Sequence, residues 1–165
     1  ADYAESLPVR VKELSDGAIP SGNSVFLCNV LRLARLVDRP DFDEKAATMT
    51  GLFSGQVAAA PAAFTHFLAA ANMAIGPTHE LVIVGESGAP DTMAMLDAFR
   101  SMYLPDMVLL FKDVHGASSD LTRLAPFIAP YTTVGGRATA YLCYDQQCEL
   151  PTNDPAVLIR QLNRR

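Results

Sequence analysis

The stretch Asp16-Gly-Ala-Ile-Pro-Ser-Gly-Asn-Ser24 leads without a break into an apolar helix, and the rest of the chain is arranged around it. Its glycines allow a sharp turn, and Ser21 or Asn23 can cap the following helix by accepting from backbone N–H groups. The same side chains, Asp16, Ser21, Asn23 and Ser24, can also bind a polar ligand such as a sugar. In the competing interpretation, these side chains form hydrogen bonds with one another and with the unpaired backbone N–H groups at the start of the helix. The motif is not the signature of any one reaction.

The helix after this motif is predicted over residues 24–37. Nearly every position is apolar except Asn29, Arg32 and Arg35, and their spacing of three residues places them on one narrow stripe. A helix that is apolar around most of its circumference packs on several sides.

Two further helices are expected before residue 76. Asp41, followed three residues later by Glu44, predicts a capped helix that runs to about Ala59. Pro61 fits the first turn of a third helix to about Ile75. Proline has no backbone N–H, and in the first turn of a helix that N–H would have no acceptor within the helix. Three helices joined by short turns predict a layer of helical hairpins.

At Gly76-Pro77 the hydrophobic period changes from helix to strand. Apolar runs over 80–85 and 106–111 enclose a predicted helix over 91–103, which indicates two parallel strands with a right-handed crossover. A third strand is expected over 138–144 and a last helix over 155–162. The predicted fold class is therefore mixed α/β. Helical hairpins occupy residues 1–76, and a small α/β domain with about three mainly parallel strands occupies residues 77–165.

Composition argues against two kinds of partner. The formal charge is -5 and the pI is about 5.1, with thirteen basic residues spread along the chain, so no nucleic-acid surface is expected. The longest apolar run, 57–75, contains Pro61, His66 and Asn72, which predicts a buried helix and no membrane span. Three cysteines without a secretory leader favour a reducing compartment, so we expect a cytoplasmic protein.

Cys143 and Cys148 bracket a predicted tight reversal after the third strand. The two thiols can act as a redox pair, bind a metal with residues from elsewhere, or simply pack. A zinc site needs four ligands and usually shows Cys-x-x-Cys spacing, which this pair lacks. We therefore expect no metal and no cofactor, and we keep packing and redox chemistry as the two interpretations.

Other polar residues form no recognisable motif. His66, His79 and His115 are far apart, although His79 and His115 fall near strand ends where they can face the same edge of the sheet. The loop Gly85-Glu-Ser-Gly88 follows a strand and precedes a helix, as phosphate-binding loops do. It lacks the third glycine of a dinucleotide motif and the lysine of a P-loop, so a plain turn is predicted.

Several segments resemble one protein family: Arg10-Val-Lys-Glu13, the 16–24 motif, Leu31-Arg-Leu-Ala-Arg35, and Ala138-Thr-Ala-Tyr-Leu-Cys143 with Cys148, Pro151 and Asp154-Pro155. Together they resemble the C-terminal region of YyaL-type proteins, bacterial relatives of spermatogenesis-associated protein 20. The resemblance implies a thioredoxin-like domain outside this sequence and an (α/α) toroid of the six-hairpin glycosidase and sugar-epimerase class. Residues 1–75 would then be the last part of the toroid, and residues 80–165 an α/β appendage.

Three functional hypotheses follow. We expect a structural or binding segment of a longer protein, without complete catalytic machinery, whose partners are the thioredoxin-like domain, the earlier toroid helices and a small sugar-like ligand. Alternatively, the parent is a carbohydrate-active isomerase, epimerase or hydrolase whose site is lined by Asp16 to Ser24. Asp16 alone supplies neither an acid–base pair nor two carboxylates, so the other groups would come from the rest of the parent. A third hypothesis makes Cys143 and Cys148 a redox pair that serves the thioredoxin-like domain.

Overall fold

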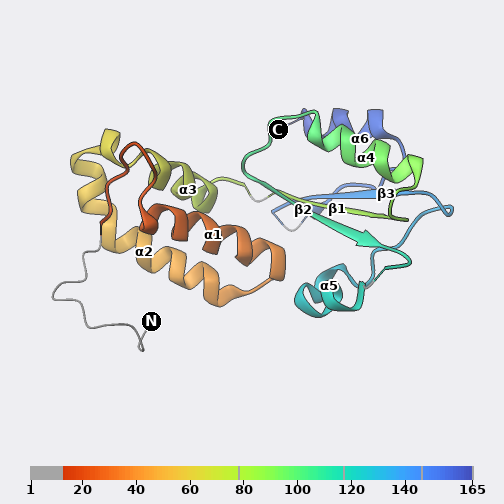
Figure 1. Cartoon of the computed structure of the whole chain (residues 1–165), viewed down its shortest axis with the longest axis horizontal. Helices are drawn as coiled ribbons and strands as arrows, with labels where there is room; N and C mark the ends of the chain where they lie inside the picture. Colours follow the sequence, from red (N-terminus) through yellow and green to blue (C-terminus); the bar gives the residue numbers. More distant parts are fainter. Residues whose placement is uncertain (1–12, 78, 117, 146, 165) are drawn as a thin grey trace.

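A computed structural model describes residues 13–77, 79–116, 118–145 and 147–164, and shows helices followed by a sheet with its own helices (Figure 1). The first part contains α1 (Gly22–Val37), α2 (Pro40–Ala59), the 3-10 turn η1 (Pro61–Ala63) and α3 (Thr65–Ile75). The second part contains β1 (His79–Gly85), α4 (Pro90–Arg100), β2 (Met107–Asp113), α5 (Ser118–Leu124), η2 (Pro126–Ile128), β3 (Thr139–Tyr144), β4 (Gln147–Cys148) and α6 (Pro155–Leu162). The predicted mixed α/β class is confirmed, whereas the toroid stays a prediction. Arg10 to Lys12 of the family motif lie outside the described residues.

Helix α1 begins and ends where the sequence places its signals. Ser21 is the N-cap, and its hydroxyl accepts from the backbone N–H of Ser24 at 3.1 Å. Asp38 ends the helix in the left-handed region, with φ 50° and ψ 56°, a conformation that aspartate tolerates better than most residues. The buried side of α1 packs on α2 and α3 in one apolar core, formed by Leu27, Val30, Leu31, Ala46, Val57, Phe64, Phe67, Ala70 and Met73 together with Leu14.

Two predicted helix starts are wrong in detail. Helix α2 begins at Pro40, with Arg39 as its N-cap residue, so Asp41 is not the cap but lies in the first turn. There its carboxylate pairs with Arg39 at 2.6 Å and with Lys45 at 3.1 Å. The third helix is interrupted, because Pro61 starts η1 and α3 begins only after Phe64 has left helical geometry, with φ -135° and ψ 41°.

The sheet has the strand order β2-β1-β3-β4. Strands β1 and β2 are parallel, with His79 beside Met107, as the strand–helix–strand pattern predicted. Strand β3 runs antiparallel to β1, and β4 runs antiparallel to β3. The prediction of mainly parallel strands is therefore wrong, because two of the three pairings are antiparallel.

The connection from β2 to β3 explains this direction. After β2, the turn through Gly135 and Gly136, with φ values of 61° and 69°, delivers the chain beside the end of β1, where Thr139 pairs with Val84. A strand that enters at that end can only run back along β1. Positive φ at two consecutive residues is the geometry of a type I′ turn, which glycine adopts without strain.

Helices cover both faces of the sheet (Figure 1). Because side chains alternate along a strand, Leu81 and Ile83 of β1 join the core beneath α4 and α6, together with Leu142, Met95 and Leu158. Val82 and Val84 face the other way, into a smaller cluster with Leu110, Ala125 and Ile128. Leu36 of α1 packs against this second cluster, so the helical layer adjoins that face of the sheet.

Two arginines of the predicted polar stripe connect the helical layer to β2. The guanidinium of Arg32 donates to the carbonyl of Pro105 at 2.5 Å. Arg35 donates to the carbonyl of Asp106 at 3.2 Å and also to the carbonyl of Met73 in α3. These bonds hold α1 beside the start of β2. Across the described ranges, no helix combines the length and the apolar content needed to cross a membrane.

Candidate functional site

The carboxylate of Asp16 is fully engaged with backbone groups. Oδ1 accepts from the N–H of Ser21 at 2.9 Å, and Oδ2 accepts from the N–H groups of His66 and Phe67 at 2.8 and 3.1 Å. Asp16 therefore supplies the missing partners at the start of α3, a helix that lacks a cap from its own N-cap residue, Phe64. Partial burial raises the pKa of Asp16, but the hydrogen bonds from Ser21, Ser24, Phe67 and His66 outweigh it and hold the pKa below its ordinary value.

The other three ligand candidates also have internal partners. The hydroxyls of Ser21 and Ser24 lie 2.9 Å apart, and both side chains are buried. The Asn23 amide donates to the carbonyl of Glu13 at 2.6 Å. The structure thus gives each of these residues a structural role, and their role in sugar binding stays a prediction.

Cys143 and Cys148 are joined by a disulfide and are direct partners across the antiparallel strands β3 and β4. Cys143 is buried, with 7% of its surface exposed, whereas Cys148 lies exposed on β4. The described residues contain no group of three or more His, Cys, Asp or Glu side chains placed to hold a metal ion. Cys28, in the helical core, is a free thiol.

The disulfide lines a cleft of about 720 Å³ between the helical layer and the sheet, which we call the interlayer cleft. Its volume lies within the range of small-molecule sites, about 300 to 1,000 Å³. Its walls carry apolar side chains from all three helices and from the sheet, and a small set of polar groups. The main lining residues are Leu31, Ala34, Arg35, Asp38, Asp43, Ala46, Met73, Glu80, Val82, Phe127, Tyr131, Cys143 and Cys148.

One cation and several carboxylates set the electrostatics of this cleft. Burial lowers the pKa of Arg35, while the nearby carboxylates of Glu80, Asp106 and Asp43 act in the opposite direction. An arginine side chain keeps its proton in proteins, so this guanidinium is a cation of the cleft. Polar groups among apolar walls can orient a ligand in the cleft. None of the predicted loop residues, Asp16, Ser21, Asn23 and Ser24, is among its lining residues.

Tyr131 is a polar residue of the cleft that contacts the disulfide. Its hydroxyl is 3.8 Å from Cys143 Sγ and 3.7 Å from Cys148 Sγ. Sequence reasoning missed it, because it lies in the irregular stretch between Leu124 and Ala138. The prolines Pro126 and Pro130 predicted that regular structure would break in that stretch, but they gave no indication of what it would contact.

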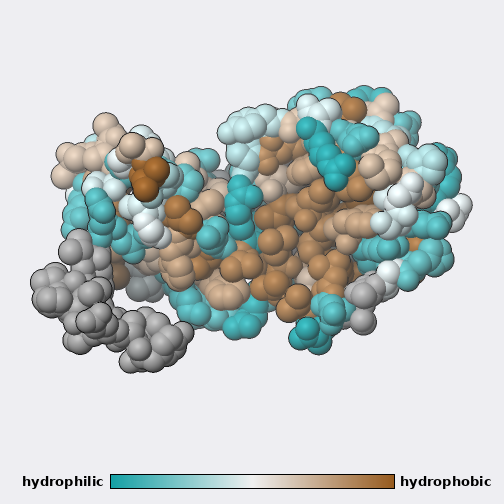
Figure 2. All heavy atoms as spheres, in the orientation of Figure 1, coloured by the Kyte–Doolittle hydropathy of each residue, from teal (hydrophilic) through white to brown (hydrophobic). Residues whose placement is uncertain are grey.

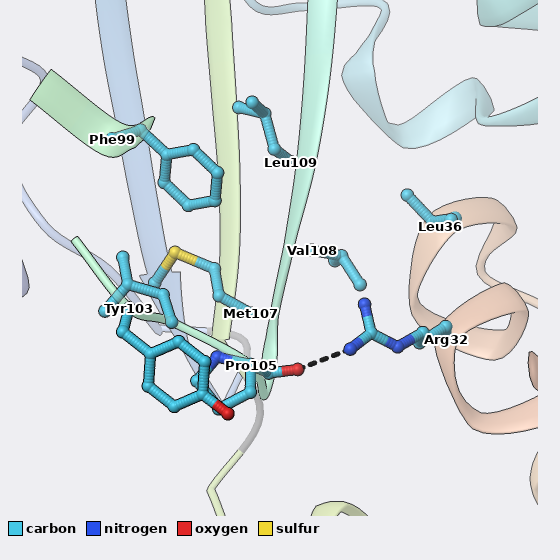
Figure 3. Close-up of a pocket in the computed structure, with 9 residues that line it drawn as sticks. Arg32, Leu36, Phe99, Tyr103, Pro105, Met107, Val108 and Leu109 are labelled. Atoms are coloured by element: carbon cyan, nitrogen blue, oxygen red, sulfur yellow. Dashed lines mark hydrogen bonds between the residues drawn. The ribbon is translucent and has the colours of Figure 1, made fainter. Parts of the chain in front are cut away.

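A second hollow of about 460 Å³, the β2-edge pocket, is lined by residues of α1, of α4 and the segment after it, and of β2. Figure 3 shows Phe99, Tyr103 and Met107 on one side and Arg32 and Leu36 of α1 on the other. The bond from Arg32 to Pro105 bridges the two sides. In the space-filling view, apolar atoms gather where Figure 1 shows β2 (Figure 2).

The remaining predicted polar residues do not form one site. His79, at the start of β1, is buried with Nδ1 3.5 Å from an Asp106 oxygen, while His115 follows the end of β2. Because β1 and β2 are parallel, the two histidines lie at opposite ends of the pair, not at one edge. In the loop after β1, the backbone of Ser87 donates to Asp113, as expected of a turn packed on its neighbour.

Comparison with known proteins identifies relatives of this chain. It is 35% identical over 164 residues to spermatogenesis-associated protein 20 of Rattus norvegicus, and 34% identical over 163 residues to the Homo sapiens protein of that name. Each match covers 99% of this chain and 21% of the relative, so the chain spans about a fifth of the length of the curated relatives it matches. No protein-family model and no solved structure matches it. The chain is therefore homologous to part of spermatogenesis-associated protein 20, the relationship that its sequence motifs predicted.

Proposed function

We propose that this chain is a structural and binding segment of a larger spermatogenesis-associated protein 20-like polypeptide, and that the rest of that polypeptide covers the β2-edge pocket. The observation that carries the proposal is the apolar character of this pocket beside β2, an edge strand of the sheet. Its lining is apolar except for Arg32 and the hydroxyl of Tyr103, and consists otherwise of Leu36, Phe99, Leu104, Pro105, Met107, Val108 and Leu109.

Strand β2 is one of the two edge strands of the sheet and pairs with β1. Proteins usually protect an edge strand by charge, by a bulge or by covering it with another segment. Tyr103, just before β2, has 90% of its surface exposed in this chain. Apolar surface concentrated at a sheet edge is typical of an interaction site, and the relatives are long enough to supply a covering segment.

The outer face of α1 supports the same role for the helical layer. Phe26 and Leu33, seven residues apart and therefore on one side of the helix, are 50% and 43% exposed. In the proposed parent, this face packs on further helices, and α1 to α3 form one edge of the (α/α) toroid that the family resemblance implies. The chain then contributes surface and rigidity, and any catalytic groups come from elsewhere in the polypeptide.

The test is binding in trans between this chain and the remaining part of the longer polypeptide, measured by isothermal titration calorimetry. Tyr103→Asp places a charge at the pocket without touching the core, so we expect it to weaken binding about tenfold or more. The matched control is Leu150→Asp, because Leu150 is 86% exposed and lies outside the pocket. Equal affinities for the two variants, or no binding by the unmodified chain, would contradict the proposal.

A further inference from the structure

The disulfide at the wall of the interlayer cleft differs from a fully enclosed structural bridge. Cys143 is buried in β3, but its partner Cys148 is exposed on β4, a strand of two residues. A nucleophile can therefore approach Cys148 from the cleft or from solvent, whereas Cys143 lines the cleft with only 7% of its surface exposed. The two sulfurs of one bond have different access, and access decides which of them is attacked.

A hydrogen-bond donor lies beside this bond. The hydroxyl of Tyr131 is 3.8 Å from Cys143 Sγ and 3.7 Å from Cys148 Sγ. Its ring stacks on Tyr141, with the ring centres 4.5 Å apart and an angle of 18° between the planes. A donor at this position can stabilise negative charge on a sulfur that leaves the bond.

The backbone that carries Tyr131 is fixed by Lys112 of β2. The ammonium of Lys112 donates to three carbonyls of this segment, those of Ile128, Ala129 and Tyr131, at 3.1, 2.9 and 2.8 Å. Because all three donors of the ammonium are used within one short stretch, the tyrosine is held at a defined place next to the sulfurs. The arrangement involves a side chain from β2, a loop and the β3–β4 hairpin.

We propose that Cys143–Cys148 is a thiol–disulfide exchange site for a dithiol reductant, with Cys148 as the attacked sulfur and Tyr131 as the donor that stabilises the departing Cys143 thiolate. This inference goes beyond the proposed binding role and does not depend on it. It assigns a function to the hydroxyl of Tyr131, which the packing of its ring alone does not require.

The reaction is a balanced two-electron exchange. One thiolate of the reductant attacks Cys148 Sγ, a new sulfur–sulfur bond forms, and the Cys148–Cys143 bond breaks with its electron pair moving to Cys143 Sγ. The second thiolate of the reductant then attacks the first reductant sulfur, which is bound to Cys148 in the mixed disulfide. The bond to Cys148 breaks, and Cys148 leaves as a thiolate. Both cysteines take up a proton to become thiols, and the dithiol becomes a disulfide.

Thiol counting in the folded protein measures this reaction. The chain has three cysteines, so the oxidised protein has one free thiol, Cys28, and the fully reduced protein has three. With dithiothreitol as the probe, we expect the count to rise from one to three under conditions in which circular dichroism shows a folded chain. A count that stays at one until the chain unfolds would overturn the proposal.

Tyr131→Phe removes the hydroxyl and keeps the ring on Tyr141. We expect it to slow reduction by dithiothreitol about fivefold, the rate effect of roughly 1 kcal/mol, a typical hydrogen bond. Tyr141→Phe is the matched control, because its hydroxyl donates instead to the carbonyl of Thr132, and its rate should stay within about twofold of the unmodified chain. Equal slowing in both variants would show that the effect is not specific to the hydroxyl of Tyr131 and would contradict its role as the donor.

The site of attack is tested without any substitution. A limiting amount of the monothiol glutathione, followed by acid quenching and peptide mass spectrometry, traps the first mixed disulfide. We expect glutathione on Cys148 and a free thiol at Cys143. Glutathione mainly on Cys143 would show that the buried sulfur is the one attacked and would overturn the assignment.

Discussion

The carboxylate of Asp16 accepts a hydrogen bond of 3.1 Å from the backbone N–H of Phe67, fifty-one residues later in the chain. With the bonds from Ser21 and His66, this contact ties the loop before α1 to the first turn of α3. The loop that the sequence offered as a ligand site therefore also connects two helices, and its role in ligand binding stays a prediction.

Replacing this carboxylate should destabilise the fold. Asp16→Asn keeps the size of the side chain but loses the charge and one acceptor, so we expect the free energy of unfolding to fall by about 1 to 3 kcal/mol at pH 7. Urea denaturation followed by circular dichroism measures the change. Asp97→Asn is the control, because the Asp97 side chain is 67% exposed and pairs with Arg100 of its own helix, and it should change stability by less than about 0.5 kcal/mol. Equal losses in the two variants would show that the contacts of Asp16 do not stabilise the helical layer.

The same carboxylate should make stability depend on pH in the acid range. The pKa of Asp16 is lower in the folded chain than in the unfolded chain, so its contribution is complete above the unfolded pKa, about 3.9. The contribution is lost as the pH falls through the lower, folded pKa. We therefore expect the stability difference between the unmodified chain and Asp16→Asn to be constant from about pH 7 to 5 and to shrink below about pH 4. A difference that grows at acid pH would mean that the pKa is shifted the other way.

Arg35 should couple the helical layer to the sheet. Arg35→Met keeps an unbranched side chain but removes the bonds to the carbonyls of Asp106 and Met73, so we expect a loss of about 1 to 3 kcal/mol. Separate probes of helix content and of Tyr fluorescence should then give unfolding transitions that no longer coincide. Arg160→Met, at an exposed position of α6, is the comparison and should leave a single transition. A single transition in both variants, without loss of stability, would contradict this role of Arg35.

Two glycines should respond to the same substitution in opposite directions. Gly135 has a φ of 61°, so Gly135→Ala should destabilise the turn before β3 by about 1 kcal/mol. Gly55 lies within α2 with open space around the position of an added Cβ, so Gly55→Ala should stabilise the chain by about 0.5 to 1 kcal/mol. Thermal unfolding of both variants tests the pair, and a change of the same sign in both would show that backbone conformation does not decide the outcome.

Local signals in the sequence predicted most of the elements. The cap at Ser21 and the apolar periodicity of each segment are set by a few neighbouring residues, so helices α1 and α6 and the parallel pair β1 and β2 lie close to their predicted ranges. The direction of β3 was not predictable in this way, because it depends on where a loop of some twenty-five residues returns to the sheet. The stripe of Asn29, Arg32 and Arg35 was visible, but its partners are backbone carbonyls more than thirty residues away.

The candidate sites show the same limit. Cys143 and Cys148 were singled out by their position around a reversal, and the structure pairs them across two strands. Tyr131 and Lys112 complete that arrangement, yet neither belongs to a motif, because side chains from three separate segments meet only once the chain has folded. Conversely, Asp16 and its neighbours formed a conspicuous motif because capping and ligand binding use the same residue types.

Amide hydrogen–deuterium exchange tests most directly the claim that this chain is a segment whose exposed sheet edge is covered by the rest of a longer polypeptide. The comparison is between residues 103–113 in the isolated chain and the same residues in the longer polypeptide, read by mass spectrometry. We predict slower exchange of this segment in the longer polypeptide, with unchanged exchange in the exposed loop around Leu150. Identical exchange of residues 103–113 in both proteins would contradict the claim.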